Sequence, residues 1–278
     1  MPAPGLYLVA TPIGNLRDVT LRALDVLAQA DVVACEDTRI TRRLLQRYGI
    51  DTPMLSYHDH NAPRVRPNLI KRLESGETVA LCSDAGTPLV NDPGYKLVTA
   101  AIDAGIDVQA MPGPSSALTA LLVAGLPCER FMFLGFPPTK AKRRLAFLAD
   151  VRDVDAALVL FEGPSRLAAM LKAAAEALGD RQAAITRELT KLHEEIRRDH
   201  LSALAAHYLA AGPPKGEVTV VIAPKDADVE VPVTDVDALL SKALVAASLK
   251  DAVDQVTGVT GWPRRRVYAR ALELRDTD

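Results

Sequence analysis

Over residues 1–112, short apolar runs rich in β-branched side chains alternate with stretches in which apolar residues recur every three or four positions. The first pattern is typical of a buried strand, and the second is typical of a helix with one apolar face. Together they predict strands at 6–10, 31–35, 53–58, 78–82 and 107–111. Because a helix is predicted between each strand and the next, the alternation indicates a parallel-rich α/β sheet.

One connection in this half is unusually long. The stretch "SDAGTPLVNDPG", residues 83–94, follows a predicted strand and precedes a helix that we expect to end at Gly105. Asp92 is predicted to be the N-cap of that helix, with Pro93 in the first helical position. Since a short turn would make the same connection, and α/β proteins bind ligands at the carboxyl ends of strands, the loop is predicted to hold a ligand.

A Pro-Gly-Pro turn at 112–114 precedes a second half, which opens with a helix capped by Ser115 or Ser116 and ending at Gly125. Apolar runs then predict strands within 130–136, 157–162, 183–189 and 215–224, and helices are predicted within 137–150, up to Gly179 and near Ser202. Some of these strands are separated by too little chain for a helical crossover. The second sheet is therefore predicted to be mixed, with adjacent antiparallel strands.

Beyond an acidic linker at 225–235, the tail predicts helices at about 236–247, from 248 onward and at 264–275, with a Gly-Trp-Pro turn between the last two. Such a pair resembles a helix-turn-helix, although most helix pairs of this size are packing units. We therefore predict three domains: residues 1–112, residues 113–226, and a linker with a small helical unit at 227–278.

Composition narrows the class of protein. The chain has 278 residues, of which 49% are hydrophobic and 4% aromatic, so its core must consist mainly of Leu, Val, Ile and Ala. No apolar run approaches the length of a membrane helix and no signal-type segment opens the chain, so we expect a cytoplasmic protein. Cys35, Cys82 and Cys128 stand singly among apolar residues, which favours reduced thiols in the core.

The formal net charge of −2 argues against a generally basic nucleic-acid coat, but basic residues are clustered. The clusters are Arg39, Arg42, Arg43 and Arg47; Arg64 and Arg66; and Lys140, Lys142, Arg143 and Arg144. A run of charge is usually a solvated helix face. Because these clusters border the candidate ligand loops, they favour a polyanionic substrate.

Three loops combine Gly, Pro and small hydroxyl residues: "TPIGN" at 11–15, "SDAGTP" at 83–88 and "MPGPSS" at 111–116. Gly allows close approach of a ligand to the backbone, and Pro stiffens the turn, so together the loops are predicted to hold one small molecule. None of them matches the phosphate loop of ATP-binding proteins or the GxGxxG dinucleotide pattern.

Two polar clusters also follow strands, "CEDTR" at 35–39 and "HDHN" at 58–61. Acid, base and Arg together suit proton transfer or phosphate contact, while helix capping explains the same residues equally well. The alternating His and Asp of the second cluster have no third ligand motif nearby, so no metal site is predicted. In the second half, "FEGPSR" at 161–166 and "RELTKLHEEIRR" at 187–198 are expected either to close the site or to be salt-bridged surface loops.

These stretches together, with "GLPCERFMFLGFPP" and "KGE", resemble the tetrapyrrole methylase superfamily in its ribosomal RNA branch over roughly residues 5–225. The tail is similar to the small C-terminal domain of that branch. Other members open with a glycine-rich stretch where this chain has "ATPIGNLRD", and this difference favours the RNA branch. The family pattern has "RG" after the EE pair, whereas this chain has "RDH" at 198–200. This difference affects the prediction for the wall of the site that the second half forms.

The resemblance implies a homodimer of two α/β domains that binds S-adenosylmethionine between them and methylates a cytidine 2′-hydroxyl in 16S ribosomal RNA within the small ribosomal subunit. It implies cofactor contacts from Pro12, Ile13, Gly14, Thr87, Leu89, Val90, Ser115, Ser116, Ala117, Phe161, Glu162 and Leu189. The alternatives are a methylase of a tetrapyrrole or another small acceptor, and an RNA-binding assembly factor without catalysis.

Methyl transfer to a ribose hydroxyl requires alignment of the oxygen with the methyl carbon and removal of a proton. We predict Asp37 or His58 as the base, with Arg39 and Lys191 steadying phosphate or developing negative charge.

Overall fold

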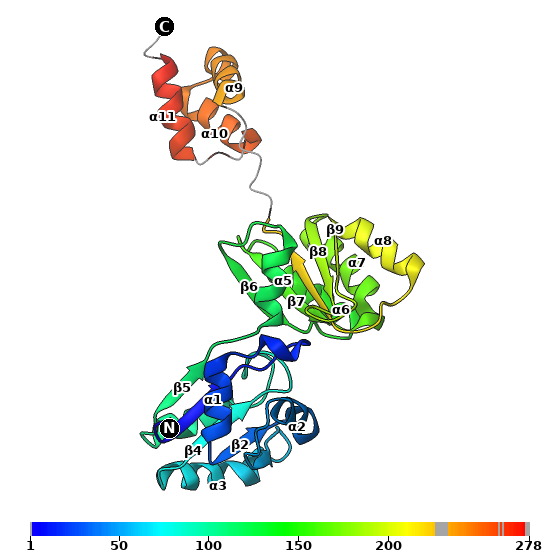
Figure 1. Cartoon of the computed structure of the whole chain (residues 1–278). Coiled ribbons are helices and arrows are strands. Elements are labelled where there is room, and N and C mark those ends of the chain that lie inside the picture. Colours follow the sequence, from blue (N-terminus) through cyan, green and yellow to red (C-terminus); the bar gives the residue numbers. More distant parts are fainter. Residues whose placement is uncertain (1, 226–232, 261, 263, 276–278) are drawn as a thin grey trace. The chain divides into compact units, whose positions relative to one another are not determined.

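The computed structural model describes residues 2–225, 233–260, 262 and 264–275 of the chain. The chain divides into two compact units, residues 1–224 and 225–278 (Figure 1). The domain boundary predicted after residue 112 falls inside the first unit, between its two sheets. The boundary predicted after residue 226 lies outside the described residues, and both stay predictions.

The first sheet has the strand order β3-β2-β4-β1-β5, and every strand pair in it is parallel. Its strands are β1 (Gly5–Val9), β2 (Val32–Cys35), β3 (Met54–Ser56), β4 (Thr78–Cys82) and β5 (Val108–Met111). Between them lie the 3₁₀ turn η1 (Leu16–Asp18) and the helices α1 (Leu21–Gln29), α2 (Thr38–Arg47), α3 (Ala62–Glu74) and α4 (Tyr95–Asp103). The predicted alternation of five strands and four helices is confirmed.

Alternate residues of these strands face opposite layers, as the period of two along a strand requires. Tyr7 and Val9 pack with α1 and α2 on one face, whereas Leu6 packs with α3 and α4 on the other. Because both faces are covered, the central strands are apolar at almost every position, which is why the sequence shows them as continuous runs.

The second sheet is mixed, as predicted, with the strand order β6-β7-β10-β8-β9. Only β6 and β7 are parallel, and β10 is antiparallel to both of its neighbours. The elements are α5 (Ser116–Ala124), β6 (Phe131–Gly135), α6 (Ala141–Ala149), β7 (Ala157–Glu162), η2 (Pro164–Arg166), α7 (Leu167–Leu178), β8 (Gln182–Arg187), β9 (Glu195–His200), α8 (Leu201–Ala211) and β10 (Val218–Ile222).

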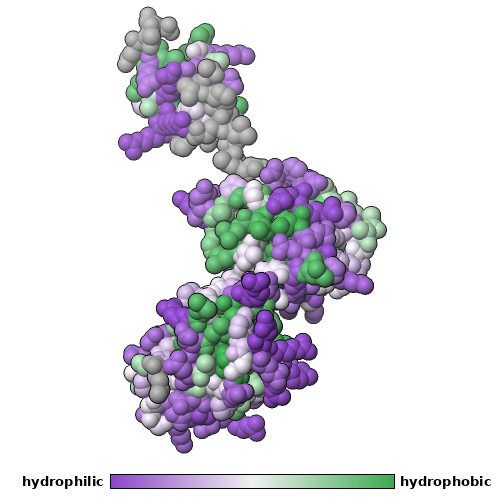
Figure 2. Space-filling model, viewed as in Figure 1, coloured by the Kyte–Doolittle hydropathy of each residue, from purple (hydrophilic) through white to green (hydrophobic). Residues whose placement is uncertain are grey.

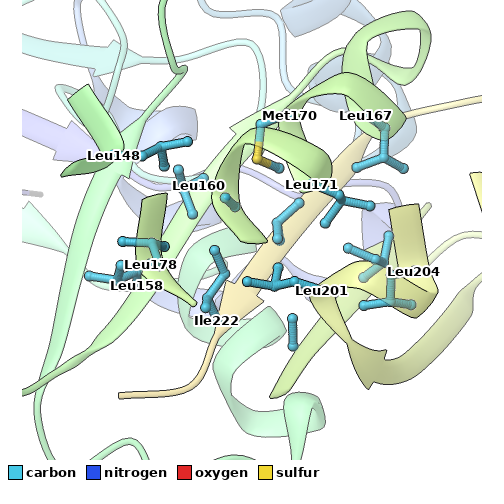
Figure 3. Close-up of a cluster of buried hydrophobic side chains, with 14 of the residues drawn as sticks. Leu148, Leu158, Leu160, Leu167, Met170, Leu171, Leu178, Leu201, Leu204 and Ile222 are labelled. Atoms are coloured by element: carbon cyan, nitrogen blue, oxygen red, sulfur yellow. The ribbon is translucent and has the colours of Figure 1, made fainter. Parts of the chain in front are cut away.

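The main core of this half lies between the second sheet and the helices α6, α7 and α8. Figure 3 shows Leu158 of the sheet beside Leu178 of α7, and Leu160 of the sheet near Leu148 of α6 and Met170 of α7. The opposite face of the sheet is covered by α5, whose Ala117 and Leu121 lie in one cluster with Ile13 of the first half. This shared cluster helps hold the two sheets of the first unit together.

The second unit consists of α9 (Val233–Ala246), α10 (Leu249–Thr260) and α11 (Arg264–Arg275), packed around Leu240, Val256, Trp262 and Val267. The predicted helices are confirmed. Of the predicted Gly-Trp-Pro turn, only Trp262 is among the described residues.

Two local predictions were wrong. Helix α4 begins at Tyr95 with Gly94 at its N-cap position, so Asp92 does not cap it. Gly94 has φ +140°, and a Cβ there would overlap the side chains of Leu89 and Leu81, so only Gly fits at this turn. Because the chain turns at Gly94, Asp92 lies before the helix start and does not cap it. Cys35 and Cys82 are buried as predicted, but Cys128 is exposed because it lies in the connection between α5 and β6.

Candidate functional site

The three Gly/Pro loops of the first half come together at the carboxyl ends of β1, β4 and β5. Thr11 and Gly86 form an isolated antiparallel bridge, with N···O distances of 2.9 and 3.0 Å. The Thr11 hydroxyl donates to the carbonyl of Ser83 at 3.1 Å, and the Thr87 hydroxyl donates to the carbonyl of Pro114 at 3.1 Å. These bonds join segments that are far apart in sequence into one rigid edge.

A cavity of about 350 Å³, here called the main cavity, lies beside this edge. One wall comes from the loop after β4 and the start of α5; the other comes from the residues after β6, the end of β7 and the start of β10. Its lining residues are Ala85, Gly86, Thr87, Val90, Asn91, Asp92, Ser115, Ser116, Phe136, Phe161, Glu162, Gly163, Pro164, Gly216, Glu217, Val218 and Thr219. Such a size and mixture suit one small organic molecule.

Six of the twelve predicted cofactor residues line the main cavity: Thr87, Val90, Ser115, Ser116, Phe161 and Glu162. The other six lie outside its lining. Ile13, Ala117 and Leu189 are buried together in one cluster. Pro12 is buried, Leu89 packs against the Leu6 side of the first sheet, and Gly14 lies beneath the side chain of Lys191. The structure therefore does not place these six residues in contact with the main cavity.

The loop 83–94 reaches the second sheet through strained backbone. Leu89 and Asn91 have φ of 72° and 69°, a left-handed conformation that is uncommon outside Gly. The side-chain oxygen of Asn91 lies only 2.9 Å from where a Cβ on Gly135 would be, so Gly135 allows the two halves to approach. The loop thereby forms a wall shared by both sheets.

Glu162 has the most informative side chain of the main cavity. Its carboxylate is almost fully buried, with 1% of the side chain exposed. Oε1 accepts hydrogen bonds from the Gly163 amide at 2.7 Å and from Arg166 at 2.8 Å, while Oε2 is buried and has no partner. Because an unpartnered buried carboxylate oxygen is costly, its position at a cavity indicates a ligand with a hydrogen-bond donor.

Aromatic rings form another part of the wall. Phe161 lies 4.9 Å from Phe133 and 5.5 Å from Phe136, measured between ring centroids, in edge-on and tilted arrangements. Phe136 is exposed at the mouth of the main cavity, which its sequence position alone does not reveal. These rings suit a flat apolar group such as a purine.

A second hollow, of about 500 Å³ and here called the acidic hollow, lies at the ends of β2 and β3. It is lined by Glu36, Asp37, Thr38, Arg39, Ser56, His58, Asp59, His60 and Asp84. Three of the predicted catalytic residues, Asp37, Arg39 and His58, lie here rather than in the main cavity. Among the described residues, no group of three or more His, Cys, Asp or Glu side chains is placed to hold a metal ion.

Asp37 has the helix-capping role that its sequence position allowed, and it is also paired with Arg39. It caps α2 by accepting from the Arg39 amide at 2.8 Å, and it forms an ion pair with the Arg39 guanidinium at 2.5 Å. These hydrogen bonds from Arg39 lower the pKa of Asp37 to about 2. The Asp37 carboxylate is consequently a weak base at neutral pH. His58 contributes a buried Nδ1 atom without a hydrogen-bond partner.

Lys191 is held by two carboxylates. Its Nζ lies 2.9 Å from Glu188 and 3.1 Å from Glu217, and its chain crosses Gly14 so closely that a Cβ there would lie 2.4 Å from Lys191 Cγ. Burial lowers the pKa of Lys191, but the hydrogen bonds to Glu188 and Glu217 outweigh burial and raise it, so the ammonium stays charged. Lys191 thus fastens the 11–15 loop to the wall that ends in Glu217.

Sequence patterns did not reveal the contributions of Asp92, Asn91 and Phe136 or of the 216–219 segment to the main cavity. Asp92 was interpreted as a cap because Asp before Pro is typical of a helix start. The length of the 83–94 loop predicted that this loop binds a ligand, but it did not indicate which of its side chains line the cavity.

Comparison with known proteins gives two family matches. The family described as Tetrapyrrole (Corrin/Porphyrin) Methylases matches residues 5–205, and the one described as RsmI C-terminal HTH domain matches residues 230–275. A ribosomal RNA small subunit methyltransferase I from Mesorhizobium japonicum is 53% identical over 275 residues, covering 99% of this chain and 93% of the relative. A protein of the same name from Micromonospora olivasterospora is 44% identical over 268 residues, covering 95% and 85%.

Solved structures give the same fold. A cobalamin biosynthetic enzyme, cobalt precorrin-4 methyltransferase, matches with a TM-score of 0.59 at 19% identity over 78% of this chain and 94% of that chain. Uroporphyrin-III-C-methyltransferase from Thermus thermophilus matches with a TM-score of 0.57 at 23% identity over the same shares. The resemblance predicted from the motifs and the predicted two-sheet fold class are confirmed.

Proposed function

This chain belongs to the tetrapyrrole methylase family and, within it, to the ribosomal RNA small subunit methyltransferase I family, and from that premise we propose that it methylates a cytidine 2′-hydroxyl in 16S ribosomal RNA. Membership confirms the predicted enzyme class, a methyltransferase that uses S-adenosylmethionine. The RNA, the ribose position and the residues that act are proposals.

The observation that carries the proposal is the free Oε2 of Glu162 beside the aromatic wall of the main cavity. S-adenosylmethionine has amino and hydroxyl donors for such an oxygen and a purine for the rings. Thr87, Ser115 and Ser116 add hydroxyl groups, and the carboxylates of the cavity complement the positive sulfonium. We assign the main cavity to this cofactor, which supplies an activated methyl group when bound.

The exposed arginines of α2 beside the acidic hollow are assigned to the RNA. Arg39, Arg42 and Arg43 lie on the exposed side of α2, whose first turn borders the acidic hollow. Arginine fits phosphate oxygens, and a ribose presented there must leave its RNA stack to reach the main cavity. Since the proposed substrate is ribosomal RNA within the small subunit, we place the enzyme in the cytoplasm. No helix among the described residues has the length and apolar character needed to span a membrane.

A homodimer is part of the proposal. Leu118 and Leu122 of α5 are 50% and 82% exposed, and Phe131 and Met132 of β6 are 46% and 41% exposed. Figure 2 shows a hydrophobic area where α5 and β6 lie in Figure 1. Contiguous apolar surface of this kind is typical of protein interfaces, so this area is the proposed contact with a second copy.

Transfer of labelled methyl from S-adenosylmethionine to small ribosomal subunits lacking their own modification tests the function. We expect label in a 2′-O-methylated cytidine of 16S RNA after nuclease digestion. Phe161→Ala, which removes the ring between Phe133 and Phe136, is expected to abolish cofactor binding and labelling together. Cofactor binding without labelled RNA would exclude the proposed substrate and favour a small acceptor, and absence of both would favour an RNA-binding factor.

A further inference from the structure

Asp92 lies in a position for which neither the sequence pattern nor the similar proteins suggest a function. It follows the left-handed residues Leu89 and Asn91, and it lines the main cavity opposite the wall formed by Glu162 and Glu217. Its side chain is partly buried rather than directed to solvent, because Gly94 takes over the start of α4. The strained turn therefore places a carboxylate where the proposed cofactor would lie.

The surroundings of Asp92 differ from those of the other carboxylates of the main cavity. Glu162 is bonded to Arg166, and Glu217 is bonded to Lys191. For Asp92 the charged groups that act on it are Glu36 and Asp84, both of which line the acidic hollow. Asp92 thus lines the main cavity and is repelled by two carboxylates of the acidic hollow, and no ion pair to it is seen in the part of the chain that the structure describes.

Burial raises the pKa of Asp92 to about 6, with repulsion from Glu36 and Asp84 in the same direction and a hydrogen bond with Ser83 opposing it. A general base works best when its pKa is close to the operating pH, because it is then both ionised and basic. Asp37, with a pKa of about 2, lacks that basicity. Asp37 is also outside the lining of the main cavity.

We propose that Asp92 is the general base of the methyl transfer; this inference rests on the proposed function. The ribose oxygen forms its bond to the methyl carbon as the carbon–sulfur bond breaks, and that electron pair stays on sulfur. The O–H bond breaks in the same step, and its proton moves to a carboxylate oxygen of Asp92. Charge balances because the positive sulfonium and the negative carboxylate both become neutral.

The first test needs no substrate. In protein labelled with ¹³C at the aspartate side-chain carboxyl, we expect one carboxyl resonance to titrate near pH 6, in agreement with burial of Asp92. This titration must be absent from Asp92→Asn. Glu36→Gln removes a repelling charge and must move the titration to lower pH. A resonance near 6 that survives Asp92→Asn overturns the assignment.

The second test measures the reaction itself. Asp92→Asn is expected to lower kcat by about 100-fold, within the range for loss of a general base. Its Kd for S-adenosylmethionine is expected to change by no more than about fivefold, because one carboxylate contributes about 1 kcal/mol at a partly exposed site. The rate of the unmodified enzyme should fall below pH 6, whereas that of Asp92→Asn should lose this acidic limb.

Asp103→Asn is the matched control, since Asp103 is an exposed aspartate at the far end of α4. It should keep the rate and the pH profile. If Asp92→Asn does not fold, Glu36→Gln provides the test. In this variant the acidic limb of the pH–rate profile must shift to lower pH by the same amount as the carboxyl titration of Asp92. An acidic limb that persists in Asp92→Asn, or that stays in place in Glu36→Gln, overturns the inference. If the unmodified enzyme labels no RNA, the proposed function fails instead.

Discussion

The main cavity and the acidic hollow border neighbouring strand ends of the same sheet, yet their walls differ in kind. The main cavity is built from glycines, aromatic rings and small hydroxyl residues, with Glu162 buried and one oxygen unpaired. The acidic hollow is lined almost entirely by ionisable and polar side chains, and its Asp37–Arg39 pair is open to solvent at Arg39.

The difference between the two cavities indicates that binding of a small molecule and recognition of RNA take place at separate strand ends of the sheet. A buried carboxylate such as that of Glu162 makes each hydrogen bond strong, and a wall of fixed shape suits a single small molecule. The exposed arginines of α2 beside the acidic hollow can bind a flexible polyanion through contacts that salt screens, so this edge of the sheet suits RNA. Substitutions that remove the buried ion pair, the glycine turn or the exposed ion pair test this difference between the two cavities.

The largest expected effect comes from the buried ion pair. Arg166→Met leaves the buried Glu162 without its cation and should lower the free energy of unfolding by about 2 to 3 kcal/mol, somewhat less than for a fully buried pair because Arg166 is partly exposed. Arg130→Met breaks an ion pair with Asp155 that is about three-quarters exposed on both sides, and should cost less than about 1 kcal/mol. Denaturant unfolding checks both, and equal losses would contradict the burial of the Glu162 carboxylate in the wall of the main cavity.

A smaller effect is expected from the backbone edge. Gly86 has φ +83°, so Gly86→Val introduces strain of about 2 kcal/mol and disturbs the bridge to Thr11. Gly76→Val is the control, because it introduces the same kind of backbone strain away from the site. Gly76 has φ +87°, and no atom lies within 4 Å of a Cβ added there. Thermal unfolding should show comparable losses for the two variants. Calorimetric titration should show weakened cofactor binding for Gly86→Val alone, and equal binding by both variants would contradict the role of this edge.

The smallest effect concerns the acidic hollow. Asp37→Asn removes a carboxylate whose pKa is lowered from 3.8 to about 2 by Arg39, so the stabilisation by this pair is fully present above pH 4. It is lost as the pH falls from about 4 to about 2. The difference in unfolding free energy between the two proteins should therefore shrink over that interval, while cofactor affinity at pH 7 stays unchanged. A difference that is constant with pH would exclude the ion pair as its source.

The sequence allowed the fold to be predicted better than the site. The first sheet was predictable because strands covered on both faces must be apolar throughout, as in "TVALC" at 78–82. Strand β9, "EIRRDH", was missed because it lies at a sheet edge where charged residues are favoured. Among the strands that the structure describes, it pairs with β8 alone, and its residues are mostly charged, so no apolar run marks it.

The loops of the site and six of the residues that line the main cavity were predictable, but the contributions of Asn91, Asp92 and Phe136 were not. Gly, Pro and hydroxyl residues mark "SDAGTP" as a ligand loop from composition alone. Whether Asp92 caps a helix or faces a cavity depends on the left-handed conformations of Leu89 and Asn91 and on Gly94, which together turn the chain. Such conformations follow from contacts with Gly135 and Leu81, which are remote in sequence.

The position of β10 has a consequence for the order in which the chain can acquire function during synthesis. This strand comes last in the first unit and lies in the middle of the second sheet, between β7 and β8. Until Val218–Ile222 has emerged, β7 is paired with β6 alone and β8 with β9 alone, so the second sheet stays divided and one wall of the main cavity is missing. A growing chain that ends before β10 thus lacks part of the proposed cofactor site, and separate fragments cut before this strand must reassemble to complete it.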